Sequence, residues 1–226
     1  MNESQFNQIG SAHLIEDINN AYLPPLVYKY RTIQQVQRFL GDRKLYFATP
    51  SEFNDPFEGK FYLEESSAEA RVREQVSNQI INNLGVFCVG TLATNIIMWS
   101  HYCEHHKGAT IEFDMRKDPE FFAGSIPVQY HMGYPRFHHK ESQLISSLQH
   151  KFQEWQHEYE VRVIKLTSGL RQIKPEAVSS IIFGVKTTLE DIEKTKQFAA
   201  QNGWNNLQFK QCIFNDNDYL LDLRSI

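Results

Sequence analysis

The sequence predicts an α+β protein of one domain, built on a mixed, largely antiparallel sheet that helices flank. Its 226 residues are 41% apolar and 22% charged, which is enough to bury a full core and is unlike the composition of disordered chains. Strand patterns are separated sometimes by capped helices and sometimes by short turns. No linker in the sequence is long enough to divide the chain.

The predicted strands are rich in aromatic and β-branched residues. The first is the run LVYKY, which follows two prolines. In a later strand Val161 and Val163 alternate with Glu160 and Arg162, which is typical of one apolar and one polar face. Strands are expected at residues 26–30, 44–48, 86–90, 109–113, 126–130, 159–166, 179–183, 207–214 and 219–223.

The predicted helices begin at capping residues. Thr32 and Gln35 form a capping box for a helix that Gly41 ends, and Asn95 is expected to cap a short helix that carries Trp99. Other helices are expected from the capping box of Ser66 and Glu69 as far as Gly85, at 140–152 and at 188–200. Residues 1–21 are expected to be an N-terminal extension to a domain formed by residues 22–226.

Charge and cysteine content restrict the classes of protein that fit. A formal charge of −4 argues against a broad nucleic-acid surface, although a local basic groove could still bind a strand or a diphosphate. The three cysteines have no regular spacing, which suits a reducing compartment. No secretory segment or membrane-spanning apolar run is present in the sequence, so a cytoplasmic protein without a membrane partner is expected.

The first group of candidate site residues is the run YKYR in the first predicted strand. Alternation places Lys29 and Arg31 on one side of this strand and Tyr28 and Tyr30 on the other. A basic pair at the end of a strand can hold a phosphate. A half-buried edge strand with solvated charges explains the pattern equally well.

The second group lies in the loop PSEFNDPFE. Asn54 and Asp55 favour a tight turn, and Phe53 and Phe57 anchor it from either side. The turn itself explains these residues, because Asn and Asp satisfy backbone groups in turns. The functional interpretation is that Asn54, Asp55 or Glu58 binds a ribose hydroxyl or a substrate amide at a pocket rim.

The third group is the dense segment MWSHYCEHHKGATIEFD. Trp99 and Tyr102 are expected on one face of a helical turn, and His101 and His105 on another, which is typical of a pocket wall. The i, i+4 histidines suggest zinc, but Tyr102 and not an acidic residue stands immediately after His101, and no third ligand has suitable spacing, so no metal is expected. His101 could act as an acid or a base near pH 7. A core tryptophan and solvated turn histidines are the structural alternative.

The fourth group is the run WQHEYEVR. Glu158, Glu160 and Arg162 are two residues apart and are expected on one face of a strand, with the carboxylate-bearing Cα atoms about 6 to 7 Å apart. Arg162 could keep one carboxylate ionised while the other binds a substrate hydroxyl or takes a proton. A salt-bridge ladder on a solvent face is the structural alternative.

Six blocks together resemble a bacterial family known as a domain of unknown function. The blocks are YKYR, LYFATPSEFNDPFE, IIMWSHYCEHHKGATIEFD, PVQY, EWQHEYEVR and IIFG, in order between Leu26 and Leu223. The chain departs from the family in its N-terminal segment and at Cys103, where a small residue such as alanine is usual. That family is in turn remotely similar to ADP-ribosyltransferase-like proteins, including DNA-targeting toxins.

The second resemblance implies NAD as the substrate, an unknown protein or nucleic-acid acceptor, and a role as a toxin or in phage defence. In those proteins a basic residue follows an early strand, aromatic residues flank the nicotinamide and a late glutamate lies near the site. The residues that match this order are Lys29 or Arg31, the segment from Trp99 to Tyr102, and Glu158 or Glu160.

The resemblance also implies a role for each candidate. Glu160 is expected to stabilise positive charge on the ribose, with Glu158 and His101 as further catalytic candidates, and Trp99 or Tyr102 to stack on nicotinamide. The expected NAD-binding residues are Lys29, Tyr30, Arg31, Asn54, Asp55, Trp99, Tyr102 and Arg162.

Two other functions remain open. A binding module would use the aromatic and basic residues to hold a nucleotide or a nucleic-acid end without turning it over, and would need no carboxylate at the ligand. A phosphodiesterase would use His101 with His131 or His138, although no spacing supports that pairing.

Overall fold

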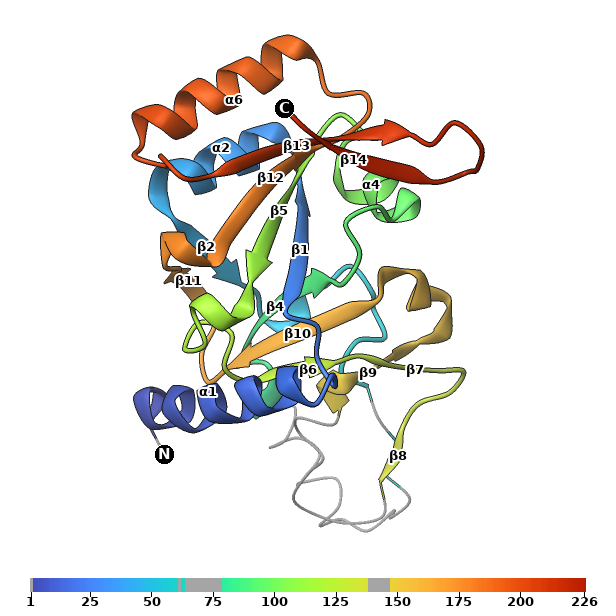
Figure 1. Ribbon diagram of the computed structural model, residues 1–226. Helices are drawn as coiled ribbons and strands as arrows, with labels where there is room; N and C mark the ends of the chain where they lie inside the picture. The colour runs from blue at the N-terminus through green and yellow to red at the C-terminus, as the bar shows by residue number, and fades with distance from the viewer. Residues whose placement is uncertain (1, 61, 64–78, 138–146) are drawn as a thin grey trace.

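An eight-stranded sheet forms the centre of this computed structural model, which describes residues 2–60, 62, 63, 79–137 and 147–226 (Figure 1). The strand order is β14, β13, β12, β5, β1, β4, β10, β6, and all neighbours are antiparallel except β12 and β13. The strands are β1 Leu26–Arg31, β4 Gly85–Gly90, β5 Ala109–Asp114, β6 Ser125–Pro127, β10 Glu160–Lys165, β12 Val178–Phe183, β13 Gln208–Phe214 and β14 Leu221–Ser225. The predicted α+β class and the mixed, largely antiparallel sheet are confirmed.

Helices and short strand pairs surround this sheet. The described helices are α1 Glu3–Asn19, α2 Ile33–Asp42, α4 Ile96–Tyr102 and α6 Leu189–Gln201, with 3₁₀ turns η1 Pro50–Glu52, η2 Met115–Lys117, η3 Gln153–Glu158 and η4 Pro175–Ala177. The short pairs are β2 Lys44–Phe47 with β11 Gly169–Gln172, β3 Tyr62–Leu63 with β8 Arg136–Phe137, and β7 Gln129–His131 with β9 His150–Phe152. Within the described ranges, no helix combines the length and the apolar character that crossing a membrane requires.

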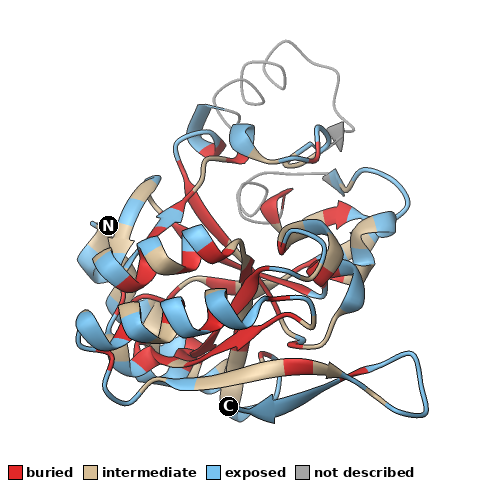
Figure 2. Cartoon of the chain, turned by 90° about the horizontal axis from the view of Figure 1, so that it is seen from above, coloured by how far each residue is buried: buried red, intermediate tan, exposed pale blue. Residues whose placement is uncertain are grey.

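Helices α2 and α6 lie side by side over one part of the sheet and enclose the main core (Figure 1). Val36 and Leu40 on α2 and Ile192 on α6 are buried in the same cluster as Ile111 and Phe113 of β5. Their outward faces are exposed (Figure 2). Burying one apolar stripe of each helix explains why the predicted helical spacing holds here.

The sheet opens between β1 and β4. Strand β1 pairs with β5 along six residues, but its pairing with β4 is limited to Tyr28 opposite Gly90. Farther along β4, Val86 pairs with Ala48 instead. In Figure 1, β12, β5 and β1 run steeply down the view, whereas β10 runs across it. Because alternate residues of a strand face the same neighbour, the backbone N–H and carbonyl of Cys88 face the opening.

The N-terminal residues form helix α1 and pack against the domain. Leu14 is buried in the main core, Gly10 lies against Ala123, and Asn7 accepts a hydrogen bond from Lys165 at 2.7 Å. The sequence analysis did not predict this helix, because its apolar residues do not gather on one face. The capping box of Asn2 and Gln5 is the local signal that could have indicated it.

Two of the predicted strands, at 126–130 and at 159–166, are wrong in their bounds. The strand expected at 126–130 is divided, because β6 pairs with β10 whereas β7 pairs with β9, and between them the Val128 N–H donates to the Glu160 carbonyl. The strand expected at 159–166 begins at Glu160. Tyr159 has a φ of 45°, and Glu158 lies in η3 rather than on the strand.

Two predicted helices lie partly outside the described residues. The capping box of Ser66 and Glu69 belongs to the undescribed part, whereas residues 79–81 are helical and Gly85 begins β4. Most of the helix expected at 140–152 is also undescribed. Its predicted end is wrong, because residues 150–152 form β9, where pairing with β7 overrides the local preference.

Candidate functional site

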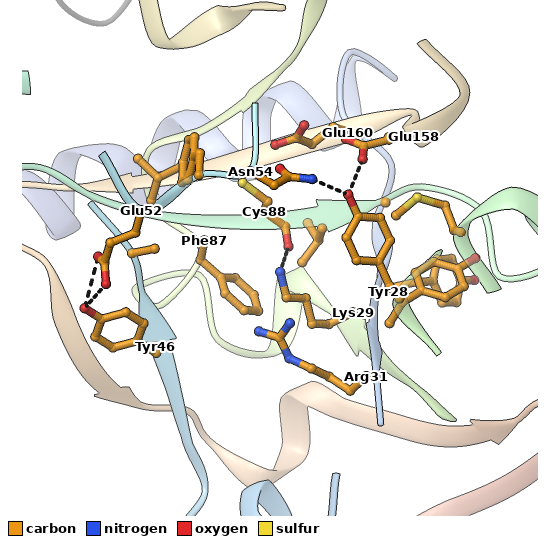
Figure 3. Close-up of a pocket in the computed structure, with 18 of the residues that line it drawn as sticks. Tyr28, Lys29, Arg31, Tyr46, Glu52, Asn54, Phe87, Cys88, Glu158 and Glu160 are labelled. Carbon is orange, nitrogen blue, oxygen red and sulfur yellow. Dashed lines mark hydrogen bonds between the residues drawn. The ribbon is translucent and has the colours of Figure 1, made fainter. Parts of the chain in front are cut away.

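A cavity of about 310 Å³ lies where β1 and β4 separate (Figure 3). One wall comes from β1 and carries Tyr28, Lys29 and Arg31. The opposite wall carries Glu158 and Glu160 (Figure 3). Aromatic rings and backbone complete the lining, including Tyr46, Phe53, Phe87, Cys88 and Tyr102. Tyr102 of helix α4 and the late acidic segment therefore border the same cavity.

The cations of the β1 wall have no acidic partner in the part of the chain that the structure describes. The Lys29 Nζ donates to the Cys88 carbonyl at 2.5 Å and lies 5.0 Å from the centre of the Phe87 ring. Burial, reinforced by the neighbouring charge of Arg31, lowers the pKa of Lys29 to about 7. Burial also lowers the pKa of Arg31. Among the described residues, neither side chain makes an ion pair.

The acidic wall is a compact network of three carboxylates and two cations. The Lys151 Nζ lies 2.5 Å from Glu158 Oε2, 2.9 Å from Glu160 Oε2 and 3.5 Å from Glu58 Oε1. The Arg162 Nε lies 2.8 Å from Glu160 Oε1, and its Nη2 lies 2.6 Å from Glu58 Oε1. Arg162 also donates from Nη1 to the Leu148 carbonyl. Both cations are buried, and both are paired with carboxylates.

This network sets the charge of each carboxylate. Burial alone would raise the pKa of Glu160, but Arg162 and Lys151 together hold it well below its ordinary value. The pKa of Arg162 is raised, because the nearby carboxylates outweigh its burial. Burial raises the pKa of Glu58, although Arg162 opposes the shift, and its Oε2 has no hydrogen-bond partner among the described residues. The two cations therefore favour the ionised form of Glu160.

Hydrogen bonds connect the acidic wall to helix α4. The Tyr102 hydroxyl donates to Glu158 Oε1 at 2.7 Å, and the Asn54 Nδ2 donates to the Tyr102 oxygen at 3.3 Å. Asn95, which caps α4 as predicted, also donates through Nδ2 to the carbonyl of His157 just before Glu158. The cap thus positions both α4 and the turn that presents Glu158.

Trp99 and His101 do not line the cavity, contrary to expectation. Trp99 is fully buried, donates from Nε1 to the Ala93 carbonyl and meets the Tyr30 ring edge-on at 5.3 Å, so it is core. His101 is exposed, with its ring 6.0 Å from that of His157. On a seven-residue helix, the face that holds Trp99 turns inward and the face that holds His101 turns to solvent.

Three other predicted ligand-binding residues contribute little surface or none. Asp55 is buried, and its Oδ1 accepts from the Phe57 N–H, as the turn interpretation expects. Arg162 is paired with Glu58 and Glu160 inside the acidic wall. Tyr30 borders the cavity but is 3% exposed, and its hydroxyl donates to the Leu92 carbonyl.

The histidines do not form the arrangements considered from the sequence. Helix α4 ends at Tyr102, and His105 and His106 have φ values of 57° and 73°, so His105 does not share a helical face with His101. The described part of the chain contains no group of three or more His, Cys, Asp and Glu residues placed to hold a metal. His131 stacks on His150 away from this cavity, and His138 lies outside the described residues.

Lys151 is the main site residue that the sequence analysis missed. It lies in a segment predicted as helix, and a single lysine there carries no local sign of burial. Cys88 was also missed, because its role depends on its backbone carbonyl and not on its side chain.

Comparisons of the chain with protein-family models, with curated proteins and with solved structures found no match.

Proposed function

We propose that the chain is an ADP-ribosyltransferase-like enzyme that binds NAD between β1 and β4. It would cleave the nicotinamide–ribose bond and transfer the product to a protein or nucleic-acid acceptor. One observation carries the proposal: Lys29 and Arg31 face the cavity without a carboxylate partner among the described residues, while two carboxylates line the opposite wall.

The basic wall suits a diphosphate. Burying a cation without a counter-ion costs free energy, and a bound anion would recover it. Arg31 supplies a charge at any physiological pH and a planar fork of donors that matches phosphate oxygens. The backbone N–H of Cys88 faces the same opening and could add a donor. Tyr28, Tyr46 and Tyr102 offer ring faces for nicotinamide or adenine, which replaces the earlier assignment to Trp99.

The acidic wall suits a developing positive charge. Cleavage of the glycosidic bond places that charge on the ribose, and a fixed carboxylate stabilises it. Glu158 replaces Glu160 as the first choice for direct contact. Both oxygens of Glu160 are held by Arg162 and Lys151, whereas Glu158 Oε1 accepts from the neutral hydroxyl of Tyr102. Glu160 would then act on the ribose through its negative charge, without direct contact.

A second function, non-catalytic nucleotide binding, is favoured by the same pairing of Glu160. Two buried cations offset the negative charge of Glu160, which weakens the electrostatic stabilisation that it can give to a positively charged transition state. The stacking rings and the basic wall would bind a nucleotide without its help.

The test is nicotinamide release from NAD by wild-type protein, Glu158→Gln and the exposed control Glu154→Gln, with NAD binding followed by thermal shift. We expect Glu158→Gln to lower release about 10²- to 10³-fold with NAD affinity changed only a few-fold, because it removes mainly transition-state stabilisation. Glu154→Gln should match the wild type. Binding without release would select the binding module, and neither binding nor release would reject both functions.

A further inference from the structure

The amine of Lys29 lies in an environment unlike that of an ordinary surface lysine. It is half-buried in the cavity wall, and among the described residues its amine contacts a neutral carbonyl oxygen at 2.5 Å and the face of the Phe87 ring. The opening between β1 and β4 creates this position, because it leaves the Cys88 carbonyl without a strand partner. Lys29 reaches across and satisfies it.

Burial and the charge of Arg31 favour the neutral form of Lys29, against the opposing charges of Glu158 and Glu160. Arg31, on the same strand and the same side, repels a second positive charge. The acidic groups that face it from η3 and β10 are Glu158 and Glu160, and both are already bound to Lys151. The Cys88 thiol on β4 is itself kept protonated, because burial raises its pKa. Because the pKa of Lys29 is lowered to about 7, its neutral form is far more populated at neutral pH than that of an ordinary lysine.

We propose that Lys29 is a nucleophilic amine that forms a Schiff base with small phosphorylated aldehydes, whose phosphate Arg31 binds. Lysines become nucleophilic when a pocket desolvates them or when another cation lies beside them, and Lys29 meets both conditions. This inference does not depend on cleavage of NAD, because it concerns the free amine and a carbonyl compound.

The chemistry balances without a redox partner. The lone pair of Nζ attacks the carbonyl carbon and forms a C–N bond, and the oxygen takes up a proton to give a carbinolamine. Loss of the second amine proton and of the oxygen as water leaves a C=N bond. In the free protein the Cys88 carbonyl accepts one N–H of the amine and leaves the nitrogen lone pair available for attack.

The experiment uses the full chain with pyridoxal 5′-phosphate as the probe and sodium cyanoborohydride to reduce any imine, followed by peptide mass spectrometry from pH 6 to 10. We expect Lys29 to be labelled at pH 7 at least ten-fold more than the exposed Lys44 and Lys107. Its labelling should have a midpoint near pH 7. Ordinary lysines are less than about one part in a thousand neutral at that pH.

Internal and variant controls come from the same chain. Lys151, whose pKa the three carboxylates raise despite burial, should stay unlabelled at pH 7. Lys29→Arg should remove the dominant adduct, and pyridoxal without the phosphate should label Lys29 about ten-fold less. Equal labelling of Lys29 and Lys44 in the wild type, or a Lys29 midpoint above pH 9, would overturn the proposal whether or not the variant folds. Equal labelling by pyridoxal would overturn the role of Arg31.

Discussion

Two pairs of cations belong to the two walls of one cavity and lie in opposite electrostatic surroundings. Lys151 and Arg162 contact three carboxylates and are buried. Lys29 and Arg31 make no ion pair among the described residues and border open space. The difference separates two uses of charge: the first pair holds the wall together, whereas the second is left for a ligand.

The largest effect should come from Arg162→Met. Removing this guanidinium leaves Glu58 and Glu160 buried with one cation between them, and breaking a buried pair typically costs about 3–5 kcal/mol. The free energy of unfolding in urea measures the loss. Arg38→Met, which removes an exposed partner of Asp42, is the matched control and should change it by less than about 0.5 kcal/mol. A loss below about 1 kcal/mol for Arg162→Met would show that the network is not ionised as described.

Arg31→Met, in contrast, should weaken ligand binding without lowering the free energy of unfolding. We expect the affinity for NAD to fall about 10- to 100-fold, because hydrogen bonds to charged groups contribute about 1.5–3 kcal/mol each. The free energy of unfolding should stay equal or rise, since no described ion pair is lost. Calorimetric titration and urea unfolding measure the two quantities. A loss of stability as large as that of Arg162→Met would mean that Arg31 has a structural partner.

Lys29→Met should remove a dependence of stability on pH. The native amine loses its proton near pH 7 and the unfolded amine near pH 10.4, so the unfolded state binds more protons between these values and stability rises with pH. The slope for one proton is at most about 1.4 kcal/mol per pH unit. The variant, compared with the wild type at each pH, should lack this rise. Parallel profiles from pH 7 to 9.5 would contradict the depressed pKa.

The smallest effect should come from Tyr102→Phe, which removes the hydroxyl between Asn54 and Glu158. We expect a loss of about 1 kcal/mol, because one acceptor oxygen of Glu158 loses its donor. Thermal unfolding measures the change, with the fully exposed Tyr219→Phe as the control. An unchanged melting temperature would place the hydroxyl outside the network.

Local signals accounted for the parts of the fold that depend on neighbouring residues. The capping box of Thr32 and Gln35 and the cap at Asn95 were predicted because each side chain bonds to backbone within three residues. Strand alternation also predicted that Lys29 and Arg31 share one side of β1, and both border the cavity. It failed for Glu158, because a left-handed Tyr159 separates that residue from the strand.

The sequence by itself determined the α+β class, the strands and helices of the core, and the residue types that could bind an anionic, aromatic ligand. Tertiary structure decided which of those residues remain accessible: it buried Trp99, turned His101 to solvent and brought Lys151 to the carboxylates. The physical reason is that capping and periodicity act over a few residues. Desolvation and ion pairing depend on which distant segments the fold brings together.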